Sequence, residues 1–202
     1  MDTDEFWALI EASAAAGTPD ERLAWLTDRL AGRPAAEAVG FVQRLDELRG
    51  PIDTWRHWGA ALLICGGLCS DDGFFYFQAW LVGQGREAYH RVLADPDALA
   101  DLPWVRRLAG RHQLDWTDEE WPDWEGLDYV ADEAYERIAG EEGGLDDVVE
   151  ARGVELRSSP DPVDEEWDVN DPAELAHRYP RLAALFPLPR EKRRSVCETA
   201  RP

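Results

Sequence analysis

The sequence predicts an all-α fold, in which short antiparallel helices form a compact array around one buried central helix. Three observations favour this fold. Helix start and stop signals recur along the chain, apolar residues repeat at intervals of three and four, and no β-branched segment alternates over five or more positions. With 45% hydrophobic residues and ten tryptophans in 202 residues, the chain is too apolar to be disordered.

The first 50 residues predict three helices joined by short turns. The first covers residues 4–16. The second begins at Thr18-Pro19-Asp20-Glu21, where Thr18 can cap the helix, Pro19 suits its first turn and Glu21 completes a capping box. The third covers residues 34–50 and ends at Gly50-Pro51. Consecutive helices with short connections favour a stack of helical hairpins.

The central part of the chain predicts the buried helix. Apolar residues repeat at helical spacing from Trp55 to Cys69, and residues 60–68 are apolar on every face, which is typical of a helix without a solvent side. Gly66-Gly67 predicts a break near the end of this helix, which we expect over residues 55–68. Ser70 then starts a helix whose apolar face runs from Phe74 to Leu81. Shorter helices are expected over residues 86–94, from Asp95-Pro96 and from Leu102-Pro103.

The composition changes between residues 115 and 171, which contain 22 acidic residues and only three arginines. We expect helices over residues 127–139 and 145–151, a loop over 158–164 and a last helix from Asp171 through His177. Residues 187–202 carry five basic and two acidic residues, without apolar periodicity, and predict a disordered basic tail. The expected organisation is one helical domain over residues 1–186, with a core over about 1–140 and an acidic, tryptophan-rich extension over about 115–171.

Several segments carry a resemblance to a known family. They are Phe6-Trp7-x-Leu9-Ile10, Trp55-x-x-Trp58-Gly59-Ala60-Ala61, a central block from Gly66-Gly67 through Gly85-Arg86-Glu87, and Asp95-Pro96-Asp97-x-Leu99-Ala100. Over about residues 1–140 the chain resembles the bacterial domain-of-unknown-function family 4240. The resemblance implies no activity, substrate or cofactor. Twenty arginines against a single lysine are typical of a GC-rich genome, such as an actinobacterial one.

The formal charge of −21 excludes whole classes of function. A chain this acidic repels nucleic-acid phosphates and anionic lipid, so we expect neither a direct nucleic-acid partner nor a membrane partner. No apolar run approaches the ~20 residues of a membrane span, and the acidic N-terminus is unlike a signal peptide. Three cysteines do not make a disulfide framework. The sequence therefore predicts a cytoplasmic protein and leaves the oligomeric state open.

One cluster is a candidate ligand site. Ser70, Asp71 and Asp72 place a hydroxyl and two carboxylates at a helix start, and Arg86 near the next helix start can pair with an anion. Such oxygens suit Mg²⁺ or Ca²⁺, or a ligand amine. Capping of the helix explains the same three residues, and we favour it. A metal site would need a third acid, for which the candidates are Asp132, Glu133 and Glu136.

Other chemistry finds little support in the sequence. Cys65 and Cys69 lie one turn apart, but His57 is too distant along a helix to complete a zinc site, and buried thiols explain the pair better. There is no Gly-x-Ser-x-Gly elbow, dinucleotide motif or phosphate loop. We therefore assign no catalytic residue, metal ligand or cofactor, and leave open whether the protein is an enzyme, leaning against it.

The second candidate is a partner-binding surface, carried by four tryptophans among the acids of residues 115–171. They are Trp116, Trp121, Trp124 and Trp167. Tryptophan provides contact area and carboxylates steer a basic partner, although such tryptophans more often pack within the protein. The leading hypothesis is an interaction or regulatory module for a basic partner, with docking of the chain's own Arg190–Arg194 segment as a variant. A ligand-binding protein or enzyme with its site at residues 70–72 is the alternative, and a nucleic-acid mimic ranks below both.

Overall fold

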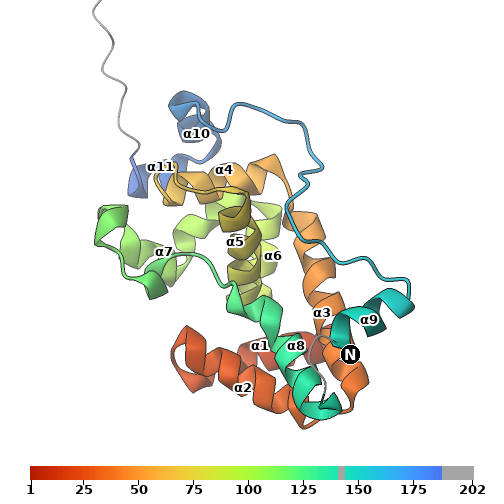
Figure 1. The fold of residues 1–202 in the computed structure, drawn as a ribbon. Coiled ribbons are helices and arrows are strands. Elements are labelled where there is room, and N and C mark those ends of the chain that lie inside the picture. Colours follow the sequence, from red (N-terminus) through yellow and green to blue (C-terminus); the bar gives the residue numbers. More distant parts are fainter. Residues whose placement is uncertain (141–143, 188–202) are drawn as a thin grey trace, which may run out of the picture.

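The computed structural model describes residues 1–140 and 144–187, and all regular structure in these ranges is helical (Figure 1). This confirms the all-α prediction. The α-helices are α1 (Thr3–Ser13), α2 (Pro19–Ala31), α3 (Ala35–Arg49), α4 (Trp55–Ile64), α5 (Asp71–Gly83), α6 (Arg86–Ala94), α7 (Pro103–Leu108), α8 (Gly126–Ala139), α9 (Gly144–Ala151), α10 (Pro172–Arg178) and α11 (Pro180–Leu185). Short 3₁₀ turns are η1 (Ala14–Ala16), η2 (Gly50–Ile52), η3 (Pro96–Asp101), η4 (Gln113–Asp115) and η5 (Asp118–Glu120). None of the described helices combines the length and apolarity needed to cross a bilayer.

The N-terminal helices begin where local chemistry predicts. The backbone N–H of Glu21 donates to Thr18 Oγ1 at 3.3 Å, and the N–H of Thr18 donates to Glu21 Oε2 at 2.8 Å, which is the expected capping box. α8 packs along α2 and α3, so a helix more than 75 positions away in sequence completes this group (Figure 1). Residues from the acidic stretch thus belong to the main helical body.

The helix predicted over residues 55–68 is shorter than expected. α4 ends at Ile64, because Gly66 and Gly67 take positive φ angles of 63° and 87° that an α-helix does not continue. Leu68 follows this break and is 63% exposed, so its inclusion in the buried rod was wrong. The centre is shared with α5, which buries almost every residue from Phe74 to its end.

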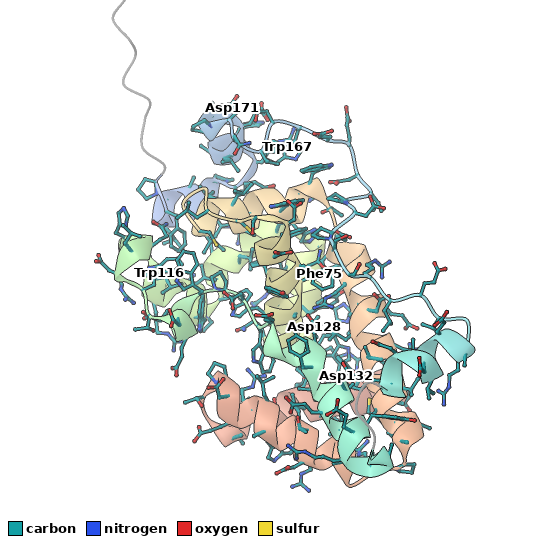
Figure 2. All side chains as sticks on the ribbon, in the orientation of Figure 1. Phe75, Trp116, Asp128, Asp132, Trp167 and Asp171 are labelled. Carbon is teal, nitrogen blue, oxygen red and sulfur yellow. The ribbon has the colours of Figure 1, made fainter. Side chains whose placement is uncertain are left out.

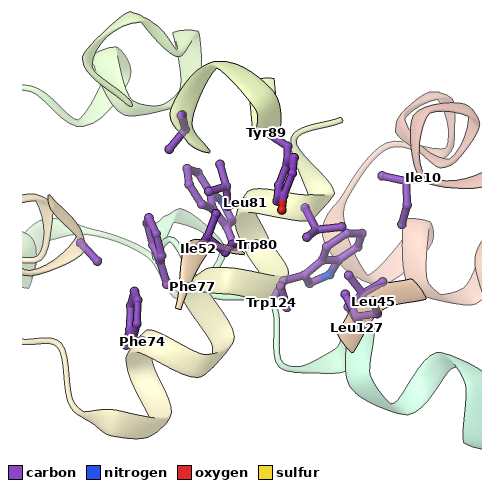
Figure 3. Close-up of a cluster of buried hydrophobic side chains, with 14 of the residues drawn as sticks. Ile10, Leu45, Ile52, Phe74, Phe77, Trp80, Leu81, Tyr89, Trp124 and Leu127 are labelled. Carbon is purple, nitrogen blue, oxygen red and sulfur yellow. The ribbon is translucent and has the colours of Figure 1, made fainter. Parts of the chain in front are cut away.

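Aromatic rings tie α4 and α5 together. Ring centroids are 4.9 Å apart between Trp58 and Phe74, 6.1 Å between Phe74 and Phe77, and 5.4 Å between Phe77 and Trp80. Figure 3 shows the last three of these rings among the buried apolar side chains. Offset aromatic contacts of this kind add about 0.5–1.5 kcal/mol per pair beyond the burial of area.

After α9 the chain runs extended across α3 to the start of α4 (Figure 1). Asp164 there accepts hydrogen bonds from the N–H groups of Trp55 at 2.6 Å and Arg56 at 3.3 Å, and so caps α4 from a distance of 109 positions. The buried Asp53 accepts from the N–H of Asp161 at 2.9 Å. These contacts fix the path of the acidic extension.

The C-terminal helices attach through a buried carboxylate. Asp97 in η3 is 5% exposed and accepts from the N–H of Leu182 at 2.9 Å and from the N–H and Nε of Arg181, both at 3.1 Å. The segment that begins at Asp95-Pro96 is therefore a 3₁₀ turn that anchors α11, whereas the sequence predicted an ordinary helix start. The predicted basic tail lies, from residue 188 onward, outside the described residues.

Candidate functional site

A cleft of about 510 Å³ lies where the start of α2, the end of α5, α7 and residues 117–124 meet. Its walls combine tryptophan rings with carboxylates. The tryptophans are Trp80, Trp104, Trp121 and Trp124, and the acids are Glu119, Glu120 and Asp123. Figure 3 shows Trp80 and Trp124 among the buried side chains of the core. The cleft therefore has the composition of a site for a cation with an apolar stem.

Trp124 is held in place from two sides. A side chain at Gly83 would not fit, because an added Cβ would lie 2.4 Å from Cε3 of the Trp124 ring. The Arg22 guanidinium carbon lies 4.4 Å from the centroid of the same ring, and its Nη2 donates to the Gly83 carbonyl at 2.8 Å. Trp124 itself is only 6% exposed. The Trp124 indole is therefore a buried, closely packed part of the cleft wall.

Hydrogen bonds to Glu120 also hold the η5 turn. Arg111 donates from Nη1 and Nη2 to the two carboxylate oxygens of Glu120, at 2.5 Å and 2.8 Å, and the N–H of Thr117 donates to Glu120 Oε2 at 3.0 Å. The hydrogen bonds from Arg111 and Thr117 lower the pKa of Glu120 to about 2. This carboxylate is therefore satisfied within the chain, and it positions Trp121 at the end of the turn.

The two remaining acids of the cleft have no such partner. Glu119 and Asp123 form no ion pair with any described residue and are exposed. Desolvation raises the pKa of Asp123, and the charges of Glu125 and Asp118 add to this shift. Arg107 also lines the cleft without an ion pair among the described residues, and Arg22 donates only to Ser13 Oγ and to backbone carbonyls, so two arginines share the cleft with these two carboxylates.

The four predicted tryptophans divide between two places. Trp116 and Trp121 contact each other edge to face, with ring centroids 5.1 Å apart, and Trp121 and Trp124 share the cleft. Trp116 is 7% exposed, so the chain itself covers its ring, whereas Trp121 is half-buried. Trp167 lies elsewhere, over Gly59 and beneath the guanidinium of Arg178 at 4.4 Å (Figure 2).

The helix start at residues 70–72 is a cap. Ser70 Oγ accepts from the N–H of Gly73 at 3.2 Å, and Asp71 is exposed. Arg86 does not join them, because its Nη1 donates to Asp4 Oδ1 at 2.7 Å and its backbone N–H donates to Glu11 Oε1 at 3.2 Å. Of these four residues, Asp72 lines a second cavity, of about 310 Å³.

Of the three acids suggested as a third metal ligand, Asp132 alone lines that second cavity. Glu133 points toward α2, where it accepts from Thr27 Oγ1 at 3.3 Å. Across residues 1–140 and 144–187, no three His, Cys, Asp or Glu side chains are grouped so that they hold a metal ion.

The residues weighed for zinc have structural roles. Cys65 and Cys69 are free thiols, and both a hydrogen bond with Cys69 and burial raise the pKa of Cys65. His57 is buried between Thr54 Oγ1 at 2.6 Å and the Val92 carbonyl at 3.3 Å, and burial lowers its pKa to about 4. The ring is therefore neutral near pH 7.

Comparison with known proteins places the chain in a family. The model of a family described as "Protein of unknown function (DUF4240)" matches residues 1–137. The chain belongs to the DUF4240 family. The match contains every residue that lines the cleft, and it stops before α9 and the extended segment. No curated protein and no solved structure matches this DUF4240 chain.

Two tryptophans of the cleft were missed by reasoning from the sequence. Trp80 was assigned only to the apolar face of its helix, and Trp104 was not singled out. Their rings lie 5.0 Å apart between centroids, although they come from α5 and α7. Helical periodicity predicts that Trp80 lies on the buried face of its helix. Periodicity does not predict which residues of a buried face also line a cleft.

Proposed function

We propose that this DUF4240 protein is an interaction or regulatory module that binds a basic protein partner, with a cationic side chain of the partner seated in the tryptophan cleft. The observation that carries the proposal is the composition of the cleft. Two half-buried rings, Trp104 and Trp121, line it. Two carboxylates, Glu119 and Asp123, line it as well and form no ion pair with any described residue.

Two physical effects support a cation in this position. A lysine or arginine head over an indole face gains roughly 0.5–2 kcal/mol from the ring's quadrupole. The formal charge of −21 also steers a basic partner toward the molecule and disfavours acidic competitors. The proposal includes a cytoplasmic location. The free thiols of Cys65 and Cys69 support it, because thiols stay reduced in that compartment.

The rigidity of the cleft adds to the affinity expected for such a partner. Trp124 is fixed by Gly83 and Arg22, and the η5 turn is fixed by Arg111 and Glu120. Because these groups already occupy their places, the cleft loses little conformational entropy when a side chain enters.

A labelled nona-arginine peptide is a suitable probe. Its binding is measured by fluorescence anisotropy at 50 and 300 mM NaCl, with the double variant Glu119→Gln/Asp123→Asn. The matched control is Asp147→Asn/Glu150→Gln, which removes the same charge from exposed positions of α9. We expect the cleft variant to weaken binding by about threefold to tenfold at low salt, and the control by less than twofold.

Salt supplies the second readout, since charge-driven binding weakens as ionic strength rises. Equal losses in the two double variants would mean that the peptide senses only the overall charge, and the cleft would not be its site. Binding that is insensitive to salt would contradict the proposal as well.

A further inference from the structure

The second cavity, of about 310 Å³, borders the first half of α5, whereas the tryptophan cleft borders the end of that helix, and it has no part in the function proposed above. Side chains of α3, α5, α8 and α9 form its walls, together with residues 156–158 of the extended segment. Figure 2 shows Phe75 on α5 facing the part of α8 that carries Asp128 and Asp132. Its volume is at the lower end of the roughly 300–1,000 Å³ of small-molecule sites.

The charges in these walls do not balance. Five aspartates and two arginines line the cavity, and each arginine already has a partner. Arg157 Nη1 lies 2.7 Å from Asp46 Oδ2, and Arg49 Nη2 lies 2.6 Å from Asp128 Oδ1. The other three carboxylates, those of Asp72, Asp132 and Asp146, have no cation partner among the described residues.

The Arg49–Asp128 pair is itself incomplete. The Arg49 side chain is only 5% exposed and stacks on Phe75, with its guanidinium carbon 3.9 Å from the ring centroid. Within the described chain, Nε of Arg49 has no hydrogen-bond acceptor and the buried Oδ2 of Asp128 has no donor. A buried polar atom left without a partner costs about 1–3 kcal/mol. A ligand that donates to Oδ2 removes part of that cost.

The surroundings of Asp132, one of these three carboxylates, raise its pKa. Burial, followed by the charges of Asp146, Glu136 and Asp128, raises its pKa to about 6. The charged and titratable groups around it are, on α3, Asp46 and Arg49; on α5, Asp72 and Tyr76; on α8, Asp128, Tyr129 and Glu136; on α9, Asp146; and on the extended segment, Arg157. Acids outnumber bases on these walls, so the position favours an added cation.

We propose that this cavity binds a small organic cation, whose ammonium or guanidinium head donates hydrogen bonds to Asp132 and Asp128 while its apolar stem packs on Phe75 and Leu156. An anion is disfavoured, because the walls carry five aspartates against two arginines, and each arginine lies against one of those aspartates. A bare divalent metal fits poorly, because the described residues offer no three-ligand group and the walls include Val42, Leu145 and Leu156.

The test is isothermal titration calorimetry with 1,4-diaminobutane at pH 7.5 in 150 mM NaCl, on the full chain. Asp132→Asn removes the central carboxylate, and Asp147→Asn is the matched control, because it removes one charge from an exposed residue of α9 outside the cavity. We expect 1:1 binding to the natural sequence, at least tenfold weaker binding to Asp132→Asn and a change below twofold in Asp147→Asn. The neutral isostere 1,4-butanediol is expected not to bind.

The pH dependence gives a second readout. Because the pKa of Asp132 is about 6 without a cation, about nine-tenths of this carboxyl is protonated at pH 5. Binding of the diamine is therefore expected to be about tenfold weaker at pH 5 than at pH 7.5, and this difference is expected to vanish in Asp132→Asn.

Three results would overturn the inference: no binding of the diamine, equal losses in Asp132→Asn and Asp147→Asn, or Asp132-dependent binding of Mg²⁺ instead of the diamine. Circular dichroism of both variants establishes that they fold. Glu119→Gln/Asp123→Asn is expected to leave diamine binding unchanged, so failure of this inference and failure of the proposed function give different results.

Discussion

Replacing Asp132 by Asn is expected to stabilise the protein near neutral pH. The folded chain raises the pKa of this carboxyl from its ordinary value of 3.8 to about 6, and that difference corresponds to about 3 kcal/mol at 1.36 kcal/mol per pH unit. The side chain is half-buried, so solvent screening reduces the figure to about 1–2 kcal/mol. A raised pKa means that folding disfavours the charged form. The natural protein therefore loses stability as pH rises from about 4 through 6.

Urea unfolding at pH 7.5 and pH 5.0 tests this reasoning, with Asp147→Asn as the control. Asp132→Asn is expected to gain about 1–2 kcal/mol at pH 7.5 and about half of that gain at pH 5.0, because less of the carboxyl is ionised there. The control is expected to stay within about 0.5 kcal/mol at both pH values. An Asp132→Asn protein that is no more stable than the natural one at pH 7.5, or whose gain does not shrink at pH 5.0, would refute the assigned electrostatics.

Three further predictions concern the supports of the cleft and of the C-terminal helices. Gly83→Ala is expected to destabilise the chain by about 1–3 kcal/mol in urea unfolding, since the new Cβ meets the Trp124 ring at 2.4 Å, and an unchanged midpoint would show that the ring moves freely. Asp97→Ala removes the buried acceptor of α11 and is expected to cost about 2–4 kcal/mol, with hydrogen exchange accelerating first in α10 and α11; uniform acceleration along the chain would contradict the local anchor. Arg111→Ala is expected to raise the pKa of Glu120 from about 2 toward its ordinary 4.5 in an NMR titration, and a pKa that stays near 2 would mean that the turn alone sets it.

Features that depend on residues close together in the sequence were predictable. The capping box of Thr18 and Glu21, the cap of Ser70 and the break at Gly66-Gly67 all depend on contacts within four positions, and each is present. The all-α class follows from the same local information, because helix caps and helical periodicity are both short-range.

Contacts between distant positions were not predictable in this way. Asp97 binds Arg181 across 84 positions, and nothing near either residue marks the other as its partner. Asp71 and Asp72 look equivalent in the sequence, yet Asp72 lines the second cavity and Asp71 does not, since successive helical residues point about 100° apart. No sequence motif surrounds Arg49 in the last turn of α3, and only the fold brings it to Asp128.

The cleft of this DUF4240 chain is tested most directly by the ten indole N–H signals of a ¹⁵N-labelled sample. During titration with nona-arginine, the signals of Trp104 and Trp121 are expected to move first, followed by those of Trp80 and Trp124 beneath them. Shifts confined to tryptophans outside the cleft, or spread evenly over all ten, would contradict a cationic side chain bound between these rings.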